Sequence, residues 1–250
     1  MVEYHLIIQK WLLGDYVIHA LKIVRFKLAK IIKGILPRDE IKKITTGLFS
    51  AQFLDGGMSG GQLGNKLKNN TQVSPNSPQY RELSELVMAA LRANEEFNAN
   101  AFPRRIISPI FSSYKQEQEY KKHVDSALMG PYPGMRTDLS ITIFLNDPDA
   151  YKGGELVLET PFGEHEYKLP PGDAILYPTH HIHHVKKITK GRRLAAVTWI
   201  ESMVPDPQKR EILNDLGEVA KTLIQSKSAI ETITKLEKGR LNLLRMWTNN

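Results

Sequence analysis

The amino-acid sequence predicts a mainly β domain with flanking helices (α+β), and three patterns in the chain support this prediction. Between residues 106 and 204, short runs rich in β-branched and aromatic residues alternate with turn signals. Before and after this segment, apolar residues recur at helical spacing. The length of 250 residues suits one large domain or two small ones, and it is enough for a sizeable buried core. We therefore expect an extension over 1–26, a domain over 27–204 with its β core at about 106–204, and a helical segment over 205–250 packed on that core.

The chain that precedes the β core is expected to hold a short strand, two helices and a loop. Apolar and basic residues alternate roughly over 26–33, which could open a strand. Proline followed by acidic residues in Pro37–Glu40 is typical of a helix start, and this helix should run to about Leu48. Apolar residues at helical spacing predict a second helix over 79–98. The glycine-rich and polar stretch 56–78 is expected to be an ordinary loop or a lid over a site.

Short β-type runs then follow one another at a spacing that is typical of an all-β sandwich or barrel, of which the jelly roll is one solution. The expected strands are 106–115, 120–124, 139–145, 155–159, 164–169, 174–177, 182–187 and 193–201. After Pro205, helical periodicity returns over 209–225 and 229–247. These helices are expected to cover the barrel, and they could also form the interface of a homo-oligomer.

The composition restricts both the kind of metal site and the kind of partner. The chain has no cysteine, which excludes disulfides, zinc–thiolate sites, iron–sulfur clusters and cysteine nucleophiles. Any transition metal must therefore be bound by histidine and carboxylate, and the absence of cysteine fits a reducing, cytoplasmic location. The 34 Lys and Arg residues exceed the 27 Asp and Glu residues, giving a net charge of +7. The basic clusters are not interleaved with aromatics in the way of single-strand nucleic-acid binders, so we expect a solvated basic surface rather than a nucleic-acid partner.

The N-terminal extension does not have the pattern of a membrane span. Leu, Ile and Val are frequent over residues 6–26, but charged residues interrupt them before an uncharged apolar run of sufficient length forms. A clean apolar stretch with a small-residue cleavage site, as in a signal peptide, is also not found. A basic amphipathic helix on a membrane surface is a further option for this segment.

Two histidine-containing segments supply the candidate metal ligands. His123 and Asp125 are two residues apart, so both side chains would point to the same face of a strand. Four histidines occur in the pentapeptide 180–184, after an interval rich in strands. Two imidazoles and one carboxylate form the facial triad that holds non-haem Fe(II) and leaves positions open. Arg193 follows, and arginine can hold a carboxylate through two parallel hydrogen bonds.

Each of these signals is weak by itself. A lone His-x-Asp pair is usually a surface or structural pair, and the histidine cluster could be a solvated patch or one that collects metal ions. Strand alternation places His181 and His183 on one face and His184 on the other, and does not choose between the first two. The combination of the pair, the strand-rich interval, a histidine and then an arginine is what favours a metal site.

Further motifs resemble those of the PKHD-type hydroxylases, which belong to the prolyl-4-hydroxylase-like branch of the Fe(II)/2-oxoglutarate oxygenases. These motifs are Lys68-Asn-Asn70 with Gln72, Arg136–Asp147, Tyr151–Leu156, Leu169–Pro178 and Thr198–Met203. They occur in the family's order and extend over roughly Lys27–Trp247, so the first 26 residues lie outside the usual pattern. The resemblance implies a double-stranded β-helix, a relative of the jelly roll, with flanking helices.

The resemblance also implies roles for individual residues. His123, Asp125 and His183 would bind Fe(II), because Arg193 lies at the family's spacing of ten residues beyond His183. His184 remains the alternative third ligand. Arg193 would pair with the distal carboxylate of 2-oxoglutarate, and Tyr114 resembles a tyrosine that often contacts this cosubstrate. L-Ascorbate is implied as an optional agent that keeps the iron reduced.

The sequence thus predicts an Fe(II)- and 2-oxoglutarate-dependent dioxygenase. It would hydroxylate a peptide or protein residue or a small molecule, with release of succinate and CO2. The alternatives are a non-catalytic jelly-roll module that binds metal or ligand and a structural β-sandwich with incidental histidines. Arg193 distinguishes the dioxygenase from the metal-binding module, because a module that only binds metal has no need for an arginine that holds a carboxylate.

A few other residues are expected to have structural roles. Arg136 and Asp138 could line the substrate pocket or form an ion pair. Trp199 is expected in the core, and His165 on an exposed strand position.

Overall fold

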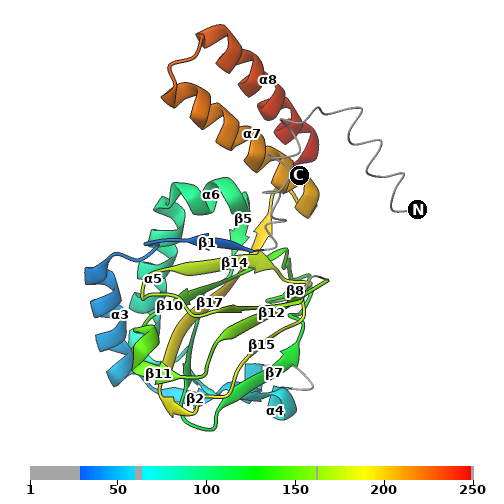
Figure 1. Cartoon of the computed structure of the whole chain (residues 1–250). Coiled ribbons are helices and arrows are strands. Elements are labelled where there is room, and N and C mark those ends of the chain that lie inside the picture. The colour runs from blue at the N-terminus through cyan, green and yellow to red at the C-terminus, as the bar shows by residue number, and fades with distance from the viewer. Residues whose placement is uncertain (1–28, 60–63, 162, 249–250) are drawn as a thin grey trace, which may run out of the picture.

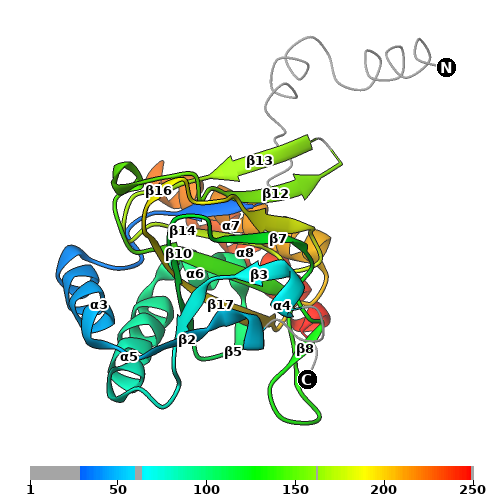
Figure 2. The same cartoon turned by 90° about the horizontal axis from the view of Figure 1, so that it is seen from below.

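The computed structural model describes residues 29–59, 64–161 and 163–248 (Figure 1). The expected extension over 1–26 and the start of the first expected strand lie outside these residues. Within the described chain, antiparallel strands form two main sheets that face each other, with helices on the outside (Figures 1 and 2). This is the jelly-roll architecture that the strand pattern predicted.

The larger sheet has eight strands in the described residues. In spatial order seven of them are β1 (Lys30–Ile32), β14 (Ala174–Pro178), β10 (Leu139–Phe144), β17 (Arg193–Ser202), β6 (Ile110–Tyr114), β4 (Thr71–Val73) and β2 (Phe53–Asp55). The eighth, β5 (Pro103–Ile106), pairs with the end of β17. The smaller sheet has the order β13 (Gly163–Tyr167), β12 (Leu156–Thr160), β15 (His183–Val185), β7 (Glu119–His123) and β3 (Lys68–Asn69).

Side-chain alternation on β10 shows how the core is divided. Ile141 and Ile143 point to the outer face of the large sheet, where they join the cluster formed with the helices. Phe144 instead joins the apolar cluster that lies between the two sheets. Ser140 and Thr142 share the parity of Phe144, and both are buried. The space between the sheets is therefore apolar at one end and partly polar towards the other.

Three helices cover the outer face of the large sheet: α3 (Arg38–Ser50), α5 (Pro78–Ala93) and α6 (Glu95–Ala101) (Figure 1). The prediction for α3 is confirmed, but the single helix expected over 79–98 is wrong. The chain bends at Asn94, which ends α5 and then caps α6 by accepting a hydrogen bond from the backbone N–H of Phe97. An N-cap of this kind offers the chain a new helix start.

The stretch 56–78 is not one loop. It contains the 3-10 turn η1 (Gly56–Ser59), the short helix α4 (Gly64–Leu67), and the strands β3 and β4. β3 pairs with β7 and β4 pairs with β6, so this stretch contributes one strand to each main sheet. The expected strand 106–115 is likewise two strands, β5 and β6. Further short pairs are β8 (Leu128–Met129) with β9 (Met135–Arg136) and β11 (Tyr151–Lys152) with β16 (Lys190–Gly191).

The last two helices, α7 (Pro207–Gln225) and α8 (Ile230–Trp247), form a hairpin that projects from one end of the β core (Figure 1). Its base contacts the core through a small apolar cluster around Phe102, Val204 and Leu213. The buried Arg210 donates to the carbonyl oxygens of residues 204 and 205 and fixes the start of α7. Among the described residues, no helix has the length and apolar character needed to cross a membrane.

Candidate functional site

The three candidate metal ligands meet where the two sheets open at one end. His123 ends β7 and His183 begins β15, and these two positions are directly paired in the smaller sheet. Asp125 follows β7 two residues later, so its side chain returns to the same side. One nitrogen of each histidine and one carboxylate oxygen lie within 4.8 Å of one another, and all three side chains are largely buried. A metal ion fits this donor set.

Backbone carbonyls fix the orientation of both imidazoles. The Nδ1 atom of His123 lies 2.8 Å from the carbonyl oxygen of Lys121, and Nδ1 of His183 lies 3.0 Å from that of His181. An Nδ1–H that donates to a carbonyl leaves Nε2 with its lone pair free for a metal. Burial, together with the neighbouring His183, lowers the pKa of His123 to about 4. The His123 ring is therefore neutral at neutral pH, as a metal ligand must be.

Two side chains of the larger sheet hold the carboxylate of Asp125 by hydrogen bonds. Ser140 Oγ donates to Asp125 Oδ2 at 2.7 Å, and Trp199 Nε1 donates to the same oxygen at 2.9 Å. Trp199 is buried as the sequence predicted, but its contact with Asp125 was not foreseen. Ser140 was missed as a site residue; its only signal is a polar residue at an inward position of a buried strand.

Arg193 lies deeper in the same cavity. Its side chain is only 1% exposed, and its guanidinium packs over the rings of Tyr114 and Phe144 at 5.4 and 5.3 Å. The Nε and Nη2 atoms have no hydrogen-bond partner among the described residues. Leaving buried N–H donors of a cation unpaired is energetically costly, so the forked pair of N–H donors of the Arg193 guanidinium is suited to bind an anion. The cavity between the fork and the metal ligands is also lined by Thr142, Tyr177, Val185 and Val197.

Tyr114 is directly paired with Arg193 on the neighbouring strand β6. Burial raises the pKa of its hydroxyl to about 12, although the charge of Arg193 opposes the shift. The hydroxyl therefore stays protonated at neutral pH and can donate to an anion beside Arg193.

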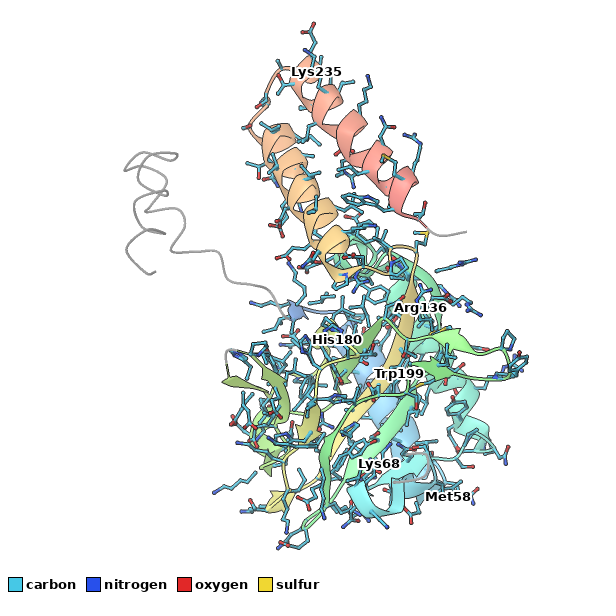
Figure 3. The ribbon with its side chains drawn as sticks, turned by 90° about the vertical axis from the view of Figure 1, so that its right-hand side faces the viewer. Met58, Lys68, Arg136, His180, Trp199 and Lys235 are labelled. Carbon is cyan, nitrogen blue, oxygen red and sulfur yellow. The ribbon has the colours of Figure 1, made fainter. Side chains whose placement is uncertain are left out.

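Two residues at the cavity opening were not identified from the sequence as site residues. The ring of Tyr120 stacks on that of His123, with 3.5 Å between the centroids and an angle of 14° between the planes. The ammonium group of Lys68 lies 4.9 Å from the centre of the Tyr120 ring, and both side chains line the cavity. Burial lowers the pKa of Lys68 to about 8, while Asp125 opposes the shift. In Figure 3, Lys68 lies farther from the C-terminal helices than Trp199 and His180 do.

The remaining histidines lie outside the ligand group. His180 is exposed, His181 is partly buried, and His184 points to the other side of β15 from His183. His165 is exposed on β13, as expected. Arg136 forms an ion pair with Asp138 at 2.7 Å and does not line the cavity, so the structural alternative for this pair is the correct one.

Comparisons with known proteins identify a family for this chain. A model of the 2OG-Fe(II) oxygenase superfamily matches residues 109–201. A PKHD-type hydroxylase of Picosynechococcus sp. is 40% identical over 217 residues, which cover 87% of this chain and 98% of that protein. A PKHD-type hydroxylase of Acinetobacter baylyi is 38% identical over 221 residues, with 87% and 97% covered.

A solved structure supports the fold. It is a prolyl hydroxylase from Trichoplax adhaerens in complex with a peptide fragment of the hypoxia inducible factor oxygen degradation domain. Its TM-score is 0.52 and its identity 14%, with 82% of this chain and 98% of that chain covered. The similarity at this identity concerns the fold. The two sequence relatives, which align over nearly their full length, show that the chain belongs to the PKHD-type hydroxylases of the 2OG-Fe(II) oxygenase superfamily and is a 2-oxoglutarate-dependent dioxygenase.

Proposed function

We propose that His123, Asp125 and His183 hold the Fe(II) of this dioxygenase, and that Arg193 and Tyr114 hold the distal carboxylate of 2-oxoglutarate. The observation that carries the proposal is the buried guanidinium of Arg193, which lines the same cavity as the three ligands and whose Nε and Nη2 have no hydrogen-bond partner in the part of the chain that the structure describes. A dicarboxylic acid can reach both ends of such a cavity. A site for a metal ion alone would have no use for the fork.

The protein's contribution to the reaction is to bind, orient and exclude water. When bound, Fe(II), the 2-oxo acid and dioxygen would supply the oxidising chemistry: 2-oxoglutarate, O2 and a C–H group are converted to succinate, CO2 and a C–OH group, so that one oxygen atom enters succinate and the other the hydroxyl group. The two histidines have their Nδ1 atoms against carbonyl oxygens, which leaves Nε2 as the nitrogen available to a metal ion. Arg193 provides two donors in a fixed plane, and Tyr114 adds a protonated hydroxyl. Leu156, Val185 and Val197 give the cavity an apolar lining that disfavours water.

The substrate is proposed to be a peptide or protein residue or a small molecule, with no nucleic acid involved. The support is that the basic clusters of the sequence are not interleaved with aromatic residues in the way of single-strand nucleic-acid binders. A cytoplasmic location is proposed because the chain has no cysteine. We also keep the division into 1–26, 27–204 and 205–250, a homo-oligomer formed through the C-terminal helices, and the optional use of ascorbate as proposals.

Succinate formation tests the assignment of the ligands. The protein is purified without oxygen, supplied with Fe(II) and 2-oxoglutarate, and then exposed to air, since slow turnover of 2-oxoglutarate does not require the substrate to be known. Wild-type protein and Asp215→Ala, a matched change at an exposed carboxylate on α7, should form succinate. Asp125→Ala should not.

A second measurement covers the case in which turnover requires the substrate. Addition of 2-oxoglutarate to the anaerobic Fe(II) protein should produce a charge-transfer absorbance in the wild type and in Asp215→Ala, but not in Asp125→Ala. Absence of this absorbance in the wild type, or undiminished succinate in Asp125→Ala, would contradict the proposed site.

A further inference from the structure

We infer that Ser140 and Trp199 are positioning residues that restrict Asp125 to metal binding through a single oxygen, Oδ1. The inference rests on the proposed function, because it concerns how the proposed iron ligand is held. It assigns a role in the reaction to two side chains that would not themselves touch the metal ion.

The first observation is that both hydrogen bonds reach the same carboxylate oxygen. Ser140 Oγ and Trp199 Nε1 donate to Oδ2 of Asp125 at 2.7 and 2.9 Å, respectively. A carboxylate oxygen has two lone-pair directions, so two donors occupy Oδ2. Oδ1 receives no hydrogen bond from the described residues. Each oxygen lies near one histidine ligand, Oδ1 at 3.8 Å from Nε2 of His123 and Oδ2 at 3.7 Å from Nε2 of His183. The two hydrogen bonds are therefore what distinguishes the oxygens, because they leave both lone pairs of Oδ1 available to a metal ion.

The second observation is that the sheet itself holds the two donors in place. Ser140 lies on β10, where it is directly paired with Trp199 of β17 on one side and Tyr177 of β14 on the other. Directly paired residues of antiparallel strands point to the same face. Ser140 is fully buried and Trp199 is 8% exposed, so neither side chain can exchange its hydrogen bond readily for water. Tyr177 is itself buried, and it lines the same cavity as Trp199.

The difference between the two oxygens of Asp125 has a consequence for coordination. A carboxylate that binds through both oxygens occupies two positions on a metal ion, whereas one that binds through a single oxygen occupies one. A facial triad needs its remaining positions for the 2-oxo acid and for dioxygen. Two donors on Oδ2 therefore preserve an open position that a freely rotating carboxylate could cover. Removing the N–H or the O–H would relax this restriction even though every ligand remains.

The test uses Ser140→Ala and Trp199→Phe, which delete one donor each and keep the size of the side chain approximately. Their matched controls are Ser84→Ala, at a buried serine of α5, and Trp247→Phe, at a tryptophan of the C-terminal hairpin. The probe is Co(II), titrated into the metal-free protein by calorimetry. Loss of a group that holds a ligand in orientation typically weakens metal binding by about 10–100-fold. We expect a loss in this range for each test variant and none for the controls.

The visible absorption of the bound Co(II) provides a readout that a merely structural role would not change. Its intensity depends on the coordination number, so a change to two-oxygen binding by Asp125 should alter it. Thermal unfolding of each metal-free variant shows whether the fold is retained, and His123→Ala locates the ion. If wild-type protein binds Co(II) no better than His123→Ala, the proposed metal site fails. If wild-type binding depends on His123 but Ser140→Ala and Trp199→Phe match the wild type in affinity and absorption, the inference about these two residues alone is wrong.

Discussion

The imidazole rings of His123 and His183 face each other from directly paired positions of β7 and β15, with centroids 4.2 Å apart and planes inclined by 52°. Because the two residues are paired in a strand ladder, their separation is set by backbone hydrogen bonds of the sheet. A site built on strands is held more accurately than one built on loops. The third ligand, Asp125, lies just beyond the strand end and depends on side chains of the opposite sheet for its position.

Tyr120 should orient His123 through ring stacking. Its ring lies 3.5 Å from that of His123 and nearly parallel to it, so it limits rotation of the imidazole. We expect Tyr120→Phe to retain Co(II) affinity within about twofold and Tyr120→Ala to lose about tenfold, as for other groups that orient a ligand. Calorimetric titration of the metal-free variants measures both values. Equal loss in the two variants would show that the hydroxyl, rather than the ring, is responsible.

Arg193→Met should stabilise the metal-free protein while abolishing its response to 2-oxoglutarate. Arg193 is 1% exposed and carries unpaired N–H donors, and leaving such a group unsatisfied costs about 1–3 kcal/mol. Methionine removes this cost, although loss of the cation–π contacts of Arg193 with Tyr114 and Phe144 offsets part of the gain in stability. Thermal unfolding with and without 2-oxoglutarate and Mn(II) measures both effects.

The neighbouring arginine supplies the control for this experiment. Arg192 Nε donates to Ser113 Oγ, and its guanidinium lies over the ring of Phe53. Arg192→Met should lower the melting temperature and leave the shift caused by 2-oxoglutarate intact. A 2-oxoglutarate shift that survives in Arg193→Met would remove Arg193 from the proposed binding site.

Gly154→Ala should displace Arg193. Gly154 has a φ of +71°, and an added Cβ would lie 2.4 Å from Ile188 Cδ1 and 3.1 Å from Arg193 Cδ. Backbone strain of this kind costs about 1–3 kcal/mol, and the clash adds to it. Gly34→Ala is the control, because Gly34 has a φ of +61° but no atom within 4 Å of its added Cβ. Both variants should lose stability, whereas only Gly154→Ala should show a raised KM for 2-oxoglutarate. Equal KM values would mean that Arg193 accommodates the added methyl group.

The spacing of apolar residues predicted the longer strands and helices well, because these elements form where one face is buried in the core. Apolar residues at every second position of β10 face the helices, and apolar residues at helical spacing in α5 face them in return. The split at Asn94 was missed because a side-chain cap competes with continuation of the helix. β3 and β4 were missed because strands of two and three residues are too short to show alternation.

The candidate site was only partly predictable, because the sequence does not show which strands are neighbours in the sheets. The His-x-Asp spacing and the distance from His183 to Arg193 are visible in the sequence, and the structure brings all four residues into one cavity. The contacts of Ser140 and Trp199 with Asp125 depend on which strands are neighbours. Nothing in the sequence states that β10 lies between β14 and β17. The sequence pointed to Lys68 only as part of a motif. Its position beside the cavity depends on the pairing of β3 with β7, which the sequence does not show.

Lys68 should titrate far below an ordinary lysine. Burial lowers its pKa to about 8 from 10.5, because desolvation disfavours the charged form. The ammonium is therefore charged below about pH 8 and neutral above it, and the nearby Asp125 limits the fall of the pKa. A divalent ion bound at Asp125 would neutralise the carboxylate that stabilises the charged Lys68, and it would add positive charge nearby. Metal binding should thus lower the pKa of Lys68 further.

Reductive methylation with 13C-formaldehyde makes this titration visible by NMR. In the metal-free protein one dimethyl-lysine resonance should titrate near pH 8, and it should be missing from Lys68→Arg, which assigns it. Zn(II) is a suitable diamagnetic ion, and its addition should shift the midpoint of this resonance downwards. In Asp125→Ala the midpoint should already be lower without metal, since the stabilising carboxylate is gone, and Zn(II) should then have little effect. A Lys68 resonance with an ordinary lysine midpoint, or one that Zn(II) leaves unchanged in the wild type, would show that the ammonium group lies too far from the proposed metal site to feel its charge.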